Sequence, residues 1–130
     1  MKKWLAWQTV GKEVAKPKVD FSGKWKNPLG SSMELKVRGN KVSGTYRTGV
    51  GAPGSMEEFP LVGFVNGDIL GFTVLWGKYG SITSWVGQHT ASKKKDRIDT
   101  MWHLVKNIDE ESERQNVWGS YLTGANSFTR

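Results

Sequence analysis

Short runs of alternating apolar and polar residues, separated by glycine, asparagine, proline and aspartate, fill the chain from Phe21 onward. Alternation with a period of two places successive side chains on opposite faces of a β-strand, and no helical pattern exceeds about two turns. The pairs Gly39-Asn40 and Asn66-Gly67 separate neighbouring runs, and both suit the positive φ angles of tight hairpin turns. The pattern predicts an all-β fold whose strands lie at residues 23–27, 32–38, 41–48, 59–65, 68–76, 82–90, 97–105 and 117–129.

Strands that follow one another through hairpins form an up-and-down meander with two exposed edges unless the sheet closes on itself. Closure of eight strands leaves an interior wide enough for side chains or for one small ligand. We therefore expect an eight-stranded antiparallel up-and-down β-barrel with a ligand pocket at its open end.

The stretch from Leu70 to Gln88 indicates what the interior contains, because it mixes large aromatic residues with small hydroxyls on one side of two adjacent strands. A buried hydroxyl without a partner costs about 1–3 kcal/mol, so an ordinary apolar core would not use it. A ligand with a polar head and an apolar body would supply the missing partners. The residues that share these inward faces are Leu70, Phe72, Val74 and Trp76 on one strand, Ser81, Thr83 and Trp85 on the next, Tyr46 with Thr48, and Trp102 with Leu104.

The 130 residues suit one barrel domain, expected over residues 21–130, preceded by an extension over residues 1–20. The extension is rich in lysine and contains Pro17, and we expect it to be flexible or loosely docked. Trp4 and Trp7 would be unusual on a disordered tail, so the extension either folds back on the barrel or on a neighbouring subunit, or is an expression or cloning remnant. The start resembles a signal peptide, but its apolar run stops at Gln8. The compartment stays open, with secretion through a segment outside this chain slightly favoured over the cytoplasm.

The formal charge of +7 raises the question of a nucleic-acid partner. The lysines concentrate in the first twenty residues and in the run Lys93 to Lys95, an expected hairpin tip, so a solvated surface is the favoured interpretation. No segment is apolar enough to span a membrane. Cysteine is absent, and neither His89 nor His103 has a neighbour at metal-ligand spacing, so we expect no metal, no cofactor and no enzyme activity.

Gly49, Gly51 and Gly54 match the G-x-G-x-x-G pattern of dinucleotide sites. That pattern requires a strand before it and a helix after it, whereas here Pro53 interrupts the run and no βαβ unit is predicted. We interpret the segment as a mobile glycine-rich loop that could cover the mouth of the barrel.

Seven segments, taken in order, show that residues 21–130 resemble the avidin/streptavidin family of biotin-binding proteins. They are FSGKWKNPLGSSM, VSGTYRTGVG, LGFTVLW, SITSWVGQ, DTMWHL, VWGSYLTG and NSFTR. The resemblance implies a non-catalytic barrel that binds biotin with high affinity, usually as a homotetramer.

The resemblance also implies a role for individual residues. Asn27, Ser31 and Tyr46 would hold the ureido oxygen of biotin. Thr48 and Asn126 would accept its N–H groups, and Asn126 stands where some members carry aspartate. Thr83 would lie near the thioether sulfur. The valerate carboxylate would reach Ser81 and the backbone of the 49–55 loop, which includes Val50. The expected walls are Phe72, Trp76, Trp85, Trp102 and Leu104, with Trp118 contributed to the pocket of a neighbouring subunit.

Two other classes of function remain as alternatives. A lipocalin-like carrier or a small-ligand enzyme would need a more uniformly apolar pocket or a titrating dyad, and the sequence offers neither. A basic β-barrel that stacks single-stranded nucleic acid on tryptophan would need outward-facing aromatic residues, whereas the alternation places most of them inward.

Overall fold

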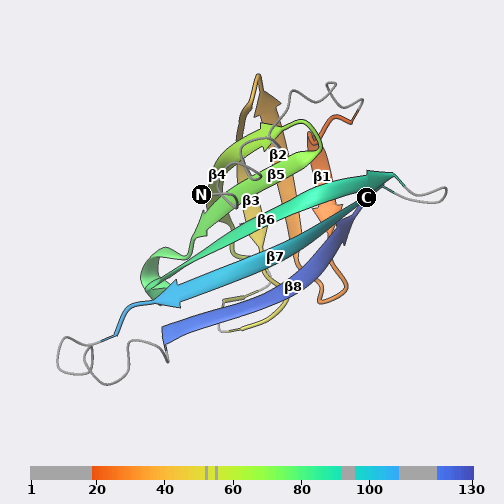
Figure 1. The fold of residues 1–130 in the computed structure, drawn as a ribbon. Helices are drawn as coiled ribbons and strands as arrows, with labels where there is room; N and C mark the ends of the chain where they lie inside the picture. The colour runs from red at the N-terminus through yellow and green to blue at the C-terminus, as the bar shows by residue number, and fades with distance from the viewer. Residues whose placement is uncertain (1–18, 52, 55, 92–95, 109–119) are drawn as a thin grey trace, which may run out of the picture.

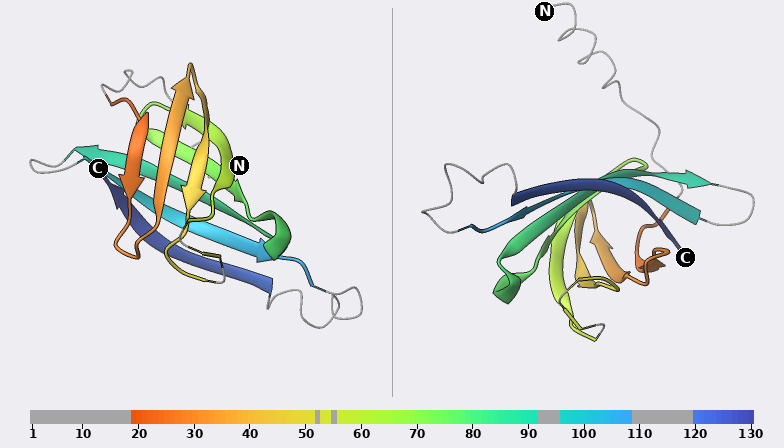
Figure 2. Two further views of the ribbon diagram at one scale, coloured as in Figure 1. Left: turned by 180° about the vertical axis from the view of Figure 1, so that it is seen from behind. Right: turned by 90° about the horizontal axis from the view of Figure 1, so that it is seen from below.

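Eight antiparallel strands follow one another around a closed barrel (Figures 1 and 2). The computed structural model describes residues 19–51, 53–54, 56–91, 96–108 and 120–130. The strands are β1 (Gly23–Lys26), β2 (Ser32–Arg38), β3 (Lys41–Arg47), β4 (Phe59–Asn66), β5 (Ile69–Leu75), β6 (Ser81–Ala91), β7 (Asp96–Lys106) and β8 (Tyr121–Thr129), with a 3-10 turn η1 (Gly77–Tyr79) between β5 and β6. The predicted fold class is confirmed. The first three residues of the predicted last strand, 117–119, lie outside the described residues, as do most of the extension and Lys93 to Lys95.

The hairpin turns at one end of the barrel lie where the sequence predicts them but differ in detail. Pairing of Arg38 with Lys41 leaves Gly39 and Asn40 as the loop, and pairing of Asn66 with Ile69 makes the second loop Gly67-Asp68 rather than Asn66-Gly67. Among the described residues only glycines have positive φ, and Gly39 and Gly67 both have φ of 61°. Positive φ at the first loop position alone is typical of a type II′ turn, which needs no second residue in the left-handed region.

The inward faces of the strands form the core of the barrel. The predicted inward side of β5 is confirmed, because Leu70, Phe72 and Val74 are all almost completely buried. The remaining fully buried side chains come from several other strands, and the largest are Trp25, Phe128, Leu35, Leu61 and Ile98. The end with the two-residue turns after β2 and β4 is the closed end.

The opposite end of the barrel carries longer connections. The segments 27–31, 48–58 and 76–80 all join strands there, and β8 begins there. Connections of this length leave room between the strand ends, which two-residue turns do not. Most of the polar residues predicted to bind ligand lie on or near these segments, so this is the open end.

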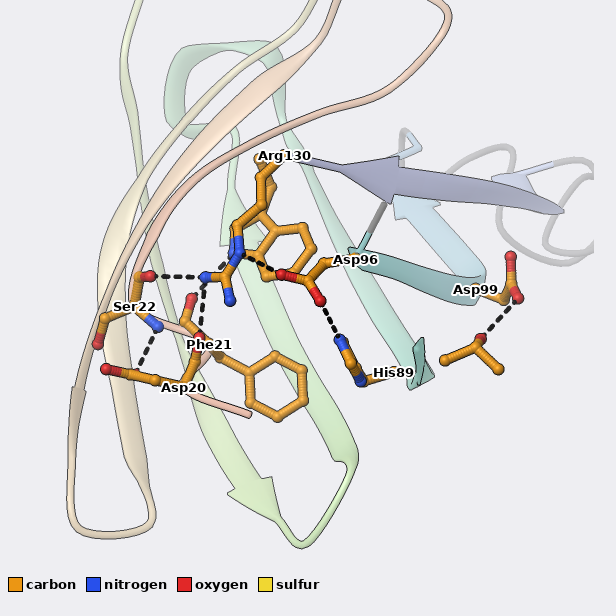
Figure 3. Close-up of polar contacts among 9 residues, drawn as sticks. Asp20, Phe21, Ser22, His89, Asp96, Asp99 and Arg130 are labelled. Atoms are coloured by element: carbon orange, nitrogen blue, oxygen red, sulfur yellow. Dashed lines mark hydrogen bonds and ion pairs between the residues drawn. The ribbon is translucent and has the colours of Figure 1, made fainter. Parts of the chain in front are cut away.

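The seam between β1 and β8 closes the barrel with little backbone pairing, since Lys26 and Thr129 are its single registered pair. The side chain of Arg130 compensates for this at the closed end (Figure 3). Its Nη1 donates to the backbone oxygens of Asp20 and Ser22 at 2.8 and 2.9 Å, and its Nε donates to Asp96 Oδ2 at 3.1 Å. Its guanidinium also lies 4.4 Å from the ring centre of Trp25, at cation–π distance. One side chain thus ties the start of β1 to the start of β7.

None of the helical structure in the described residues is long and apolar enough to cross a lipid bilayer.

Candidate ligand-binding site

The connection between β1 and β2 fixes Asn27 in one orientation. Its side-chain Oδ1 accepts hydrogen bonds from the backbone N–H groups of Leu29 and Ser31 at 3.1 and 3.0 Å. The backbone of Asn27 also bonds to Ser31 O at 3.0 Å and to Gly30 N at 3.2 Å. Because the amide oxygen is used by the turn, the side chain presents its NH₂ group, a pure donor, to its surroundings.

Tyr46 brings its hydroxyl to the same point from β3. The side chain is 2 % exposed, and its ring centre lies 4.9 Å from that of Trp85 and 5.7 Å from that of Trp76. Burial raises the pKa of Tyr46 above its usual 10.0, while side-chain hydrogen bonds with Ser31 and Asn27 act in the opposite direction. The hydroxyl therefore stays protonated at neutral pH and can donate.

Ser31 connects this cluster to the loop that follows β3. Its Oγ accepts the backbone N–H of Gly49 at 3.0 Å, and its own proton can be donated to Tyr46 or to a ligand oxygen. Thr48 Oγ1 donates to the backbone oxygen of Val50 at 2.9 Å and accepts its N–H at 3.2 Å, so the first residues of the loop form a compact turn. Thr48 is buried, whereas half of the Val50 surface is exposed at the mouth.

Aromatic side chains line the barrel next to the polar cluster. Phe72 and Trp85 stack with ring centres 5.0 Å apart and an interplanar angle of 12°. Trp76 Nε1 donates to the buried Thr83 Oγ1 at 2.8 Å, which orients that indole. The indole Nε1 of Trp85 is the single buried side-chain nitrogen or oxygen without a hydrogen-bond partner in the described part of the chain.

The β7 and β8 side of the mouth is less completely covered. Trp102 and Leu104 face inward but are only half-buried, and Asn126 is half-buried on β8. Asn126 Oδ1 accepts from Thr100 Oγ1 at 2.9 Å and retains a second lone pair. Ser81 is partly exposed at the start of β6. Trp118 and Ser55 lie outside the described residues, so their predicted contributions are not part of this geometry.

The structure brings two residues to the site that the sequence prediction missed. Thr100 is buried behind Asn126, and the alternation with Ile98 and Trp102 on its strand already marks it as inward. Phe59 is 6 % exposed, and its ring centre lies 4.8 Å from that of Trp76. Its place as the first residue of β4 carries no sequence signal that separates it from any core phenylalanine.

Groups that would point to other chemistry lie elsewhere. His103 faces outward with its ring centre 5.5 Å from that of Tyr121, and His89 Nε2 lies 3.2 Å from Asp96 Oδ1 at the closed end (Figure 3). Arg47 also faces outward and pairs with Glu58. The described residues contain no group of three histidine, cysteine, aspartate or glutamate side chains that could hold a metal ion. Gly49, Gly51 and Gly54 lie on the β3–β4 loop and belong to no βαβ unit.

A closed barrel with fixed hydrogen-bonding groups and aromatic walls at its open end defines a small-ligand-binding protein. Comparison with known proteins then gives the family. The sequence pattern of the avidin family matches residues 15–130. Afifavidin of Afifella pfennigii is 35% identical over 116 residues, which cover 83% of this chain and 67% of that protein. Avidin of Gallus gallus is 31% identical over 136 residues, covering 97% of this chain and 88% of avidin.

A solved structure agrees with these matches. The crystal structure of Xenavidin superimposes with a TM-score of 0.76 and 33% sequence identity, covering 87% of this chain and 98% of that one. The chain belongs to the avidin family. This confirms the resemblance inferred from its motifs, and the family consists of biotin-binding proteins rather than enzymes.

Proposed function

We propose that this protein binds biotin non-catalytically inside the barrel. The observation that carries the proposal is the convergence of Asn27, Ser31 and Tyr46, each with its acceptor oxygen already engaged by the backbone or by one another. Asn27 and Tyr46 each keep a proton for a ligand oxygen placed between these groups, and Ser31 can turn its proton from Tyr46 to the same oxygen. The oxygen of a cyclic urea is a strong acceptor that can receive three hydrogen bonds, and fixed donors in a dry site are stronger than the same groups in water.

The other predicted contacts follow from this anchor. With the ureido oxygen at the three donors, Thr48 and Asn126 would accept the two ureido N–H groups. Thr83 would lie near the sulfur, and its hydroxyl, which accepts from Trp76, keeps a proton to donate there. The carboxylate would point to the mouth, toward Ser81 and the backbone N–H groups of the loop that begins at Gly49.

The walls would enclose the bicyclic ring of biotin and its chain. Phe72, Trp76 and Trp85 lie on the well-buried side, and Trp102 with Leu104 on the more open side. The unpartnered indole N–H of Trp85 supports a polar occupant, because a buried donor without a partner is costly.

We further propose that the protein assembles as a homotetramer in which Trp118 closes the pocket of a neighbouring subunit. Support comes from apolar side chains that one chain leaves uncovered. Leu122 is 55% exposed beside the half-buried Leu104 at the mouth. On the outer face, Val62 and Phe64 are more than 60% exposed and line a hollow of about 950 Å³, outside the barrel and away from the polar cluster. Exposed apolar surface of this kind is typical of subunit interfaces.

The domain division, the location and the partners of the protein are proposed as well. Residues 21–130 form the binding domain and residues 1–20 an appended segment. Secretion is the location we favour, and the partners expected are biotin and further copies of the chain, with neither nucleic acid nor membrane.

Isothermal titration tests this function with two ligands. Biotin should bind with one site per chain. A cyclic guanidine analogue, in which a nitrogen group replaces the ureido oxygen, should bind far more weakly at low pH, where its protonated nitrogen meets three donors. Equal binding of both ligands would show that the three donors do not discriminate the ureido oxygen from the protonated nitrogen. Light scattering of the same samples gives the mass of the particle and so tests the tetramer.

A further inference from the structure

Two connections at the open end are joined by one carboxylate. Glu57 lies on the connection between β3 and β4, and Tyr79 lies in η1 between β5 and β6. The Tyr79 hydroxyl donates to Glu57 Oε1 at 2.7 Å, and the backbone N–H of Gly54 donates to the same oxygen at 3.3 Å. The ammonium of Lys78 lies 3.6 Å from Glu57 Oε2. Sequence reasoning gave no role to any of these residues.

The protonation states of the pair favour this contact. The hydrogen bond from Tyr79, followed by that from Gly54, lowers the pKa of Glu57 below its usual 4.5. The same bond to Glu57 raises the pKa of Tyr79 above its usual 10.0. At neutral pH the carboxylate is therefore ionised and the phenol protonated, the combination that makes a charge-assisted hydrogen bond.

Tyr79 also packs against aromatic residues that line the site. The ring centre of Tyr79 lies 6.0 Å from that of Phe59, which in turn packs on Trp76. At its other end the same connection begins with Gly49, whose N–H is held by Ser31. The β3–β4 connection is thus attached at one end to the polar cluster and at the other to the rim of the barrel.

We propose that Glu57 and Tyr79 are positioning residues that hold the β3–β4 connection against the mouth and thereby slow the exit of the ligand. The inference rests on the proposed function and extends it to the acidic tail of the ligand, which would leave past this connection. Neither side chain belongs to the polar cluster that holds the ureido group. Loss of the contact should therefore act on a ligand that has a tail and spare one that has only the ring.

Tyr79→Phe is the informative variant, because it removes the hydroxyl and keeps the ring that packs on Phe59. Glu58→Gln is the matched control, since Glu58 is the next residue on the same connection but pairs with Arg47 outside the barrel. The dissociation rate is measured by displacing radiolabelled biotin with an excess of unlabelled biotin. The dissociation constant of 2-imidazolidone, a cyclic urea without a tail, is measured by titration.

We expect Tyr79→Phe to raise the dissociation rate of biotin roughly five- to tenfold, because interface changes act mostly on dissociation. Binding of 2-imidazolidone and the thermal unfolding midpoint should stay unchanged, as should all three quantities in Glu58→Gln. Glu57→Gln removes the charge but keeps an oxygen that can accept from Tyr79, so it should raise the dissociation rate less than Tyr79→Phe does, and adding it to Tyr79→Phe should change the rate little further.

Three results would overturn the inference. An unchanged biotin dissociation rate in Tyr79→Phe would show that the contact does not hold the ligand in. An equal loss for biotin and 2-imidazolidone would show a general structural role. Failure of the unaltered protein to bind biotin would overturn the proposed function itself, and this inference with it.

Discussion

Replacement of Tyr46 by phenylalanine tests the polar cluster with the smallest change the site allows. The ring is held by Trp85, Trp76 and Phe72, all with ring centres within 6.5 Å, so phenylalanine should occupy the same place. Only the hydroxyl is lost, and with it one of three donors to the ureido oxygen.

The size of the effect follows from the environment of that hydroxyl. The ureido oxygen of biotin is a strongly polarised acceptor, and a hydrogen bond to such an oxygen in a buried site contributes about 1.5–3 kcal/mol. That corresponds to a roughly 10- to 150-fold increase in the dissociation constant for biotin. The folded protein also loses the hydroxyl's bonds to Asn27 and Ser31, about 1 kcal/mol, which lowers the unfolding midpoint of a domain of this size by about 3–5 °C.

Biotin affinity is measured by competition and stability by calorimetry without ligand. Ser84→Ala is the matched control, because it removes a hydroxyl that bonds to Thr73 Oγ1 at 2.7 Å on the outward face. The control should leave biotin affinity unchanged. An affinity within twofold of the parent in Tyr46→Phe would refute the assignment of this hydroxyl, as would an equal loss in the control.

Three further predictions concern the closed end and the assembly. Arg130→Ala should lower the free energy of unfolding, measured by denaturant titration, by about 2 kcal/mol. The substitution removes two hydrogen bonds to backbone oxygens and a cation–π contact. An unchanged free energy of unfolding would mean that backbone pairing alone closes the seam between β1 and β8. The hydrogen bond from Arg130, then that from His89, lowers the pKa of Asp96 below 3.8, so this stabilisation is present above that pH and is lost as the pH falls through the lowered value. Unfolding midpoints measured from pH 7 to pH 2 should therefore fall less steeply below about pH 4 in Arg130→Ala than in the parent, and parallel curves would contradict the link. Trp118→Lys should weaken biotin binding and reduce the mass in solution by light scattering, whereas unchanged values of both would count against the shared tryptophan.

Period-two alternation predicted most of the fold, because each inward face had to be apolar and each turn needed glycine or asparagine. Leu70, Phe72 and Val74 lie on the predicted face for that reason. Thr83 and Trp85 were identified as site residues on the same strand because a hydroxyl beside a large aromatic ring is unusual in a core. The same rule would have identified Thr100.

Contacts between side chains distant in the sequence could not be predicted this way. Arg130 reaches Asp20 across 110 positions, and its sequence context resembles that of any solvated cation. Glu57 and Tyr79 meet only because the β3–β4 and β5–β6 connections emerge at the same end of the barrel. Their pairing depends on loop paths, and alternation carries no information about loop paths.

The crystal structure of the protein with biotin tests the central claim most directly. The ureido oxygen should lie inside the barrel, about 2.7–3.2 Å from Asn27 Nδ2, Ser31 Oγ and Tyr46 Oη at once. Biotin bound on the outer face, or inside the barrel with its ureido group turned away from these three atoms, would contradict it.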